Sequence, residues 1–330
     1  MAKGSITDRW NNFIERNLLI QFIDVVLRGC GQVMFQNNPL TGLLFFIAIF
    51  IGGYSENLPQ TGYACLLATA CATLTAYLYK LDKTSLRAGI YGYNGCLVGV
   101  GLATFLNNSI YLWIVIIFAS ILSVIATQSL SIFFKIWKLT PLTAPFVIVS
   151  WIILLSSYEF YSIKGIALPT PHNPIQYLNH VNTISAFSSL IPDTLRGLSE
   201  VFLFSNMVVG IIFLIGLAVN SISSASYALL GSFLSIIAVI FLQSDINTIN
   251  IGLYSFSAVL TGIALGSIFN QPSISVTIYT IIGVFLTIFI QAALDIALQP
   301  IGIPTLTMPF VLATWFLLNS NKEFTATNIK

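Results

Sequence analysis

The chain has 330 residues, of which 56% are hydrophobic and only 7% are charged. Soluble domains carry roughly 25% charged residues, so this composition excludes a protein whose whole surface meets water and indicates lipid as its surroundings. The formal net charge of +2 is too small to indicate a nucleic-acid partner.

A helix that crosses the hydrocarbon core of a bilayer needs about 20 apolar residues. The polar N-terminal stretch 1–17 does not resemble a cleaved signal peptide, and we expect it in the cytoplasm. The apolar run 18–34 contains charges, amides and glycines, which favour a re-entrant half-helix over a complete span. Five predicted spans then follow at 39–54, 61–79, 88–105, 110–134 and 143–157.

The second part of the chain has the same organisation. A polar connection over 158–184 is followed by a second expected half-helix at 185–201, and a short tail over 320–330 ends the chain. Long unbroken apolar runs lack the period-two alternation of a membrane β-barrel, so the predicted fold is an all-α polytopic membrane protein. The second set of predicted spans lies at 204–220, 226–243, 251–269, 275–298 and 307–319.

The placement of Lys and Arg predicts the orientation, because cytoplasmic loops are enriched in these residues. With ten spans, the basic residues outside the half-helices fall on one side of the membrane, and only Lys164 falls on the other. We therefore expect both termini in the cytoplasm and the connection 158–184 outside, in a plasma membrane that is a bacterial inner membrane. The cytoplasmic set is Lys3, Arg9, Arg16, Lys80, Lys83, Arg87, Lys135, Lys138, Lys322 and Lys330.

The chain also repeats itself, with repeat 1 over 18–157 and repeat 2 over 185–319. Segment 27–33, LRGCGQV, matches 195–201, LRGLSEV, and segment 142–147, LTAPFV, matches 306–311, LTMPFV. Between them, 91–97 matches 254–260 at a similar offset. Each repeat holds an odd number of predicted spans, so the second repeat enters from the opposite face. Inverted repeats are typical of transporters, whose solute site lies near the midplane where the repeats meet.

Charged and polar residues at membrane depth are candidates for function, because burying them in lipid is costly. Arg28 and Arg196 are expected to have a structural role. Asp24 lies one helical turn from Arg28 and is a candidate partner for it. Asp295 lies near a span end and is expected to reach the interface or to hold the helix end. Thr143 and its equivalent, at position 307, precede a proline by two residues, which predicts a helix start with a hydroxyl at mid-depth that could also cap the helix.

The remaining reactive residue types do not indicate an enzyme or a metal centre. Cys30, Cys65, Cys71 and Cys96 form no C-x-x-C pair and are expected to pack as small buried side chains. The two histidines lack a neighbouring Cys or acidic cluster, so no metal or other cofactor is expected. The sequence contains neither G-x-S-x-G nor H-E-x-x-H, so no enzyme activity is predicted.

Several motifs of this sequence resemble those of the urea transporter family, of the bacterial type. The resemblance runs from about residue 18 to 319 and is carried by 27–42, LRGCGQVMFQNNPLTG, by 92–99, GYNGCLVG, and by the duplicated Leu-Thr-x-Pro-Phe. It implies a channel-like fold of ten membrane helices and two re-entrant helices. It also implies a pore inside each protomer and a homotrimer.

The resemblance further implies two flat slots on either side of a narrow middle. Phe35 and Tyr93 would form one slot, and Leu203 and Phe256 the other. Phenylalanine is typical of the family at positions 93 and 203, so we expect the two slots to be unequal. Tyr93 adds a hydroxyl to an otherwise apolar slot, and Leu203 removes one ring face.

Rows of oxygen acceptors would run along the pore between the slots. Gln32 and Glu200, which occupy equivalent places in the two repeats, would hold the ends of these rows. The residues implied at the constriction are Val33, Leu97, Thr143, Val201, Leu260 and Thr307.

Urea suits such a path, because it is small, planar and neutral and carries several N–H donors. Apolar rings would strip water from its faces, and oxygens along its edge would replace lost hydrogen bonds that otherwise cost a few kcal/mol each. The expected partners are therefore urea, small amide analogues and membrane lipid. An ion-coupled transporter that uses Glu200 or Asp24, and an ammonia or water channel, remain alternatives.

Overall fold

The computed structural model describes residues 17–172, 189–244 and 252–320. These residues are helical, and within the described ranges the only β pairing is an isolated bridge between Leu106 and Gly165. The predicted all-α class is confirmed. The polar N-terminus up to residue 16, residues 173–184 of the connection, residues 185–188 of the second half-helix and the tail from 321 lie outside the described residues.

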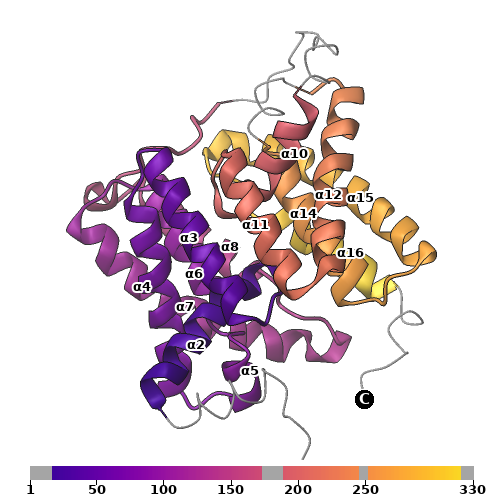
Figure 1. Ribbon diagram of the computed structural model, residues 1–330. Coiled ribbons are helices and arrows are strands. Elements are labelled where there is room, and N and C mark those ends of the chain that lie inside the picture. Colours follow the sequence, from indigo (N-terminus) through magenta and orange to yellow (C-terminus); the bar gives the residue numbers. More distant parts are fainter. Residues whose placement is uncertain (1–16, 173–188, 245–251, 321–330) are drawn as a thin grey trace, which may run out of the picture.

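The first half of the chain follows the predicted order of helices, drawn from indigo to magenta in Figure 1. The predicted span 88–105 is shorter than expected, because Gly89 adopts a left-handed turn with φ of 78° and the helix begins only at Tyr93. The elements are α2 (Leu18–Gly31), η1 (Gln32–Met34), α3 (Pro39–Ser55), α4 (Gln60–Leu78), α5 (Lys83–Arg87), α6 (Tyr93–Phe105), α7 (Ile110–Phe134), η2 (Lys135–Trp137), α8 (Ala144–Ser156) and η3 (Tyr161–Ile163).

The second half repeats this order, drawn from red to yellow in Figure 1. Its helix ends lie within a few residues of the predicted spans wherever both are described. The elements are α10 (Leu190–Ser199), η4 (Glu200–Phe202), α11 (Met207–Asn220), α12 (Ile222–Phe241), α14 (Ser255–Ile263), η5 (Ala264–Ile268), α15 (Ile274–Leu298), η6 (Gln299–Ile301) and α16 (Met308–Ser320).

Helix lengths fit a protein that passes several times through a membrane. Among the described residues, α4, α12 and the continuous segments α7–η2 and α15–η6 are each long and apolar enough to cross a bilayer. Two bent pairs, α2–η1 with α3 and α10–η4 with α11, each pass the same test as a pair. Helices such as α6, with 13 residues, reach only about 20 Å, so the ten predicted spans stay a prediction.

Both bent pairs turn in the same way, and each turn has an angle of 75°. The first helix tightens into a 3₁₀ turn that ends at Phe35 or Leu203, each with φ of 62°. An asparagine then starts the next helix: the side chain of Asn38 caps α3, and that of Asn206 caps α11. The duplicated sequence therefore produces a duplicated turn, and the predicted half-helices occupy the first arm of each pair.

The helices after the two turns run antiparallel to each other, and they face each other between the halves in Figure 1. Asn38, at the start of α3, donates to Asn220 at the end of α11, with an Nδ2–Oδ1 distance of 3.4 Å. Asn206, at the start of α11, donates to the Ser55 hydroxyl at the end of α3 over 3.1 Å. This reciprocal pairing agrees with the inverted repeats predicted from the odd number of spans.

A second reciprocal pair joins the halves near α8 and α16. The indole nitrogen of Trp151 donates to the carbonyl oxygen of Pro304 at 2.8 Å, and that of Trp315 donates to the carbonyl oxygen of Thr140 at 2.9 Å. Both the donors and the acceptors are separated by 164 positions, so each tryptophan holds the turn before the other repeat's helix. The two halves are thus related by an approximate two-fold axis.

Candidate functional site

Two threonines meet where the halves join. Thr143 immediately precedes α8 and Thr307 precedes α16, which confirms the predicted helix starts. Their Oγ1 atoms lie 2.6 Å apart, and both residues are buried. The Thr143 side chain makes no capping hydrogen bond, so the capping interpretation is wrong for this residue: its hydroxyl pairs with Thr307 across the approximate two-fold axis.

Asn94 performs the capping that Thr143 does not. Its Oδ1 accepts a hydrogen bond from the backbone N–H of Phe146, in the first turn of α8, at 3.1 Å. Its Nδ2 donates to the Thr127 hydroxyl at 3.1 Å and to the carbonyl oxygen of Leu142 at 3.4 Å. An amide within an apolar run is the feature of the sequence that could have identified this residue, which is fully buried in the structure.

A small cavity lies beside the threonine pair and is lined by both halves. Its volume of about 10 Å³ is about the room that one water molecule needs. The lining includes three residues that the sequence did not predict, namely Val100, Phe146 and Leu306. The predicted site residues that the cavity brings together are Leu97, Glu200, Val201, Leu203, Phe256 and Thr307.

The cavity is too small for urea in this arrangement of side chains. Urea is larger than water, and the hydroxyls of Thr143 and Thr307 are in direct contact. The pore that the resemblance implies inside the protomer stays a prediction. The threonine pair is a direct contact between the two halves beside this cavity.

Phe35 contacts two rings that the sequence analysis did not name. Phe35 makes edge-on contacts with Phe269 and Phe310, each with ring centroids 6.1 Å apart. The hydroxyl of Tyr93 donates to the carbonyl oxygen of Leu142 at 2.5 Å, so it is bound to the turn that precedes Thr143. The pairing of Phe35 with Tyr93 stays a prediction. Phe310 was missed, although it is the last residue of the duplicated Leu-Thr-x-Pro-Phe.

The equivalent slot in the second half contains one ring fewer. Leu203 occupies the turn position of Phe35, and Phe146 occupies the position of Phe310. Both reach the same place on α6, because an added Cβ on Gly101 would lie 3.3 Å from Phe146 and 4.0 Å from Leu203. Leu203 and Phe256 line the same cavity, as their predicted pairing requires.

The remaining candidates lie outside the cavity lining, and Gln32 is only partly buried. The amide nitrogen of Gln32 donates to the carbonyl oxygen of Ala88 at 2.8 Å, which ties the end of α2 to the turn before α6. Val33 and Leu260 are buried in the core that joins the halves. Their role at the constriction stays a prediction.

The two arginines of the predicted half-helices, both partly buried, have structural partners. Arg28 pairs with Asp24, with 2.7 Å between Nε and Oδ2, as the spacing predicted. Arg196 pairs with Asp193 at 2.7 Å, a partner three residues away that the sequence analysis missed. Asp295 accepts a hydrogen bond from Gln291 at 2.9 Å, one turn earlier in α15. All three contacts lie within their own helices.

Comparisons with known proteins agree with the resemblance. The profile of the family described as "Urea transporter" matches residues 23–322. Urea transporter 1 of Ovis aries is 29% identical over 98% of this chain and 84% of its own length, and that of Capra hircus is 28% identical over the same shares. Urea transporter 1 of Mus musculus is 28% identical over 97% of this chain and 83% of its own length. The chain belongs to the urea transporter family.

Proposed function

We propose that this protein conducts urea passively through a path between its two inverted halves. The observation that supports the path is the cavity beside Thr307, whose walls come from both repeats and include, besides apolar residues, the oxygen-bearing residues Glu200 and Thr307. Apolar walls remove water from the faces of urea, and oxygens accept its N–H groups. An ion would find no replacement for its hydration shell at an apolar constriction.

We also propose a membrane orientation and an oligomeric state for the protein. Ten spans would place both termini in the cytoplasm, and the membrane would be a plasma membrane, in particular a bacterial inner membrane. Each protomer would hold its own path within a homotrimer, and small amide analogues of urea would compete for it. We also propose that Gln32 holds one end of a row of oxygens and that Phe35 and Tyr93 form one slot. Val33 and Leu260 would line the constriction.

Urea flux in proteoliposomes tests the passive mechanism. We expect the purified chain to accelerate urea equilibration over protein-free liposomes, and we expect the rate to ignore imposed proton and sodium gradients. A rate that follows either gradient would instead support an ion-coupled transporter that uses Glu200 or Asp24. Ammonia or water flux that greatly exceeds urea flux in the same liposomes would also contradict the proposal.

Matched substitutions at the threonine pair test the place of the path. Thr307→Val removes the hydroxyl at nearly constant shape, whereas Thr307→Ile also adds a methyl group at the contact between the two halves. We expect the isoleucine variant, and likewise Thr143→Ile, to lower urea flux well below that of the valine variant. The comparison uses liposomes that hold equal amounts of monodisperse protein. Equal flux in the isoleucine, valine and unchanged proteins would place the path elsewhere.

A further inference from the structure

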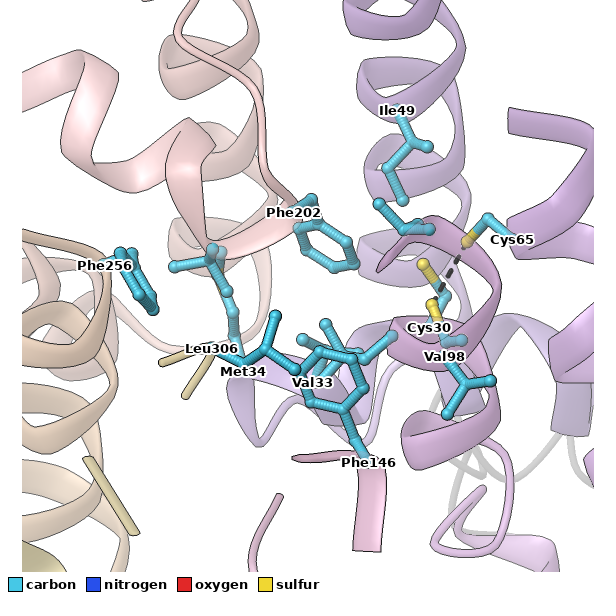
Figure 2. Packing of buried hydrophobic residues seen from close by; sticks show 14 of the residues in the cluster. Cys30, Val33, Met34, Ile49, Cys65, Val98, Phe146, Phe202, Phe256 and Leu306 are labelled. Carbon is cyan, nitrogen blue, oxygen red and sulfur yellow. Dashed lines mark hydrogen bonds between the residues drawn. The ribbon is translucent and has the colours of Figure 1, made fainter. Parts of the chain in front are cut away.

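Three cysteines from three helices meet in the core of the first half. The sulfurs of Cys30 in α2, Cys65 in α4 and Cys96 in α6 all lie within 4.8 Å of one another. The Sγ atoms of Cys65 and Cys96 are 3.1 Å apart, and all three residues are free thiols with no exposed surface. Figure 2 shows Cys30 and Cys65 close together among the buried apolar side chains, with a dashed line for the contact between the sulfurs of Cys65 and Cys96.

The three possible metal ligands in this group are all sulfur atoms. Within the described residues, the group consists of cysteines alone and includes neither histidine nor carboxylate. Soft sulfur ligands favour soft ions such as Cu(I), whereas a structural zinc site requires four ligands in a tetrahedron. The surroundings are the apolar core that contains Val33, Val98 and Leu97. Three sulfurs that converge in a dry pocket match the ligand number and softness of a three-coordinate Cu(I) site.

Charge balance favours a monovalent ion over a divalent one. A thiol releases its proton to solvent when it becomes a thiolate ligand. With one cysteine ionised and the other two sulfurs bound as neutral thiols, a monovalent ion leaves the loaded site neutral, whereas a divalent ion requires two ionised cysteines. An uncompensated charge in an apolar core is costly, so the site that needs fewer ionised groups is favoured.

We propose that Cys30, Cys65 and Cys96 form a binding site for a soft monovalent cation, with Cu(I) as the reference ion. Cys71 also belongs to α4, but it is only partly buried and lies outside the group. It therefore provides a matched control on one of the same helices.

The site lies directly behind the proposed path. Leu97 of the cavity lining follows Cys96, and Val33 lies one turn after Cys30. The sulfurs of Cys65 and Cys96 must move apart from 3.1 Å to admit an ion between them, which displaces α6 and its lining residue. Cu(I) is therefore expected to lower urea flux. This effect rests on the proposed function, whereas binding of the ion does not.

Competition against a chromogenic Cu(I) chelator tests binding directly. The full chain in detergent, reduced and kept without oxygen, is expected to take one Cu(I) per chain from the chelator. Cys71→Ala should retain this stoichiometry, and the double variant Cys65→Ala/Cys96→Ala should lose it. No binding by the unchanged chain, binding that persists in the double variant, or loss of binding in Cys71→Ala would each overturn the site.

X-ray absorption at the copper edge tests the site without any substitution. The loaded unchanged protein should show a first shell of three sulfur neighbours, and a shell of nitrogen or oxygen would overturn the assignment. Urea flux with and without Cu(I) then separates the two proposals. Binding without any change in flux would overturn the coupling to transport, whereas flux lost in all samples, including those free of copper, would contradict the proposed function alone.

Discussion

Replacing Gly42 by valine is expected to prevent the chain from reaching its folded state. Gly42 lies in the first turns of α3, where an added Cβ would overlap the carbonyl group of Leu27 in α2. The obstacle is backbone at the base of a 75° bend, so neither helix can yield without opening the bend. We expect a loss of more than about 4 kcal/mol, which is a large part of a typical folding free energy.

The neighbouring residue provides the control for this variant. Leu43 lies on the exposed side of the same helix, and Leu43→Val changes side-chain volume without touching α2. Size-exclusion profiles in detergent should show a monodisperse peak for Leu43→Val and aggregate for Gly42→Val. Gly210→Val should behave like Gly42→Val, because its added Cβ would overlap the carbonyl group of Leu195. A folded, active Gly42→Val protein would refute the close packing of α2 and α3.

Replacing Arg196 by methionine is expected to destabilise the fold by about 3 kcal/mol. The substitution leaves the carboxylate of Asp193, whose side chain is fully buried, without the guanidinium 2.7 Å away. An isolated buried charge is far more costly than a neutral amide of the same shape. The double variant Asp193→Asn/Arg196→Met should therefore recover much of the lost stability.

Guanidinium titrations in detergent, followed by tryptophan fluorescence, provide the free energies for this comparison. Lys83→Met is the control, because it removes an exposed positive charge from α5 and should change the unfolding free energy by less than about 0.5 kcal/mol. If the double variant were as unstable as Arg196→Met alone, the pairing of Arg196 with Asp193 would not explain the loss.

Much of the fold could be predicted because its signals are local. The run that became α3 was predicted at 39–54, and the helix covers Pro39–Ser55, because an asparagine and a proline mark its start. The repeated LRG segments predicted that the two halves share one structure, and the duplicated turn at Phe35 and Leu203 follows this pattern. The start of α6 was misplaced because the turn at Gly89 depends on backbone conformation, which hydropathy does not report.

The details of the site depend on contacts between distant segments, and local patterns do not encode these. Thr143 was correctly placed at a helix start, but nothing in its own neighbourhood shows that its hydroxyl pairs with Thr307, 164 positions away. The sequence showed that Phe146 belongs to a duplicated motif. It did not show that its side chain faces α6, because that depends on how α8 packs on α6. Burial of Cys30 was predicted, but its approach to Cys65 requires the packing of α2 on α4.

The reciprocal bonds of Trp151 and Trp315 have a kinetic consequence. A solute that enters from either face meets nearly the same sequence of barriers, because a half-turn about the approximate axis exchanges the two approaches. Inward and outward rates under equal and opposite gradients should therefore be similar. Any remaining difference between the inward and outward rates would arise where the repeats differ in chemistry, such as Phe35 against Leu203. The net flux would still vanish when the two concentrations are equal.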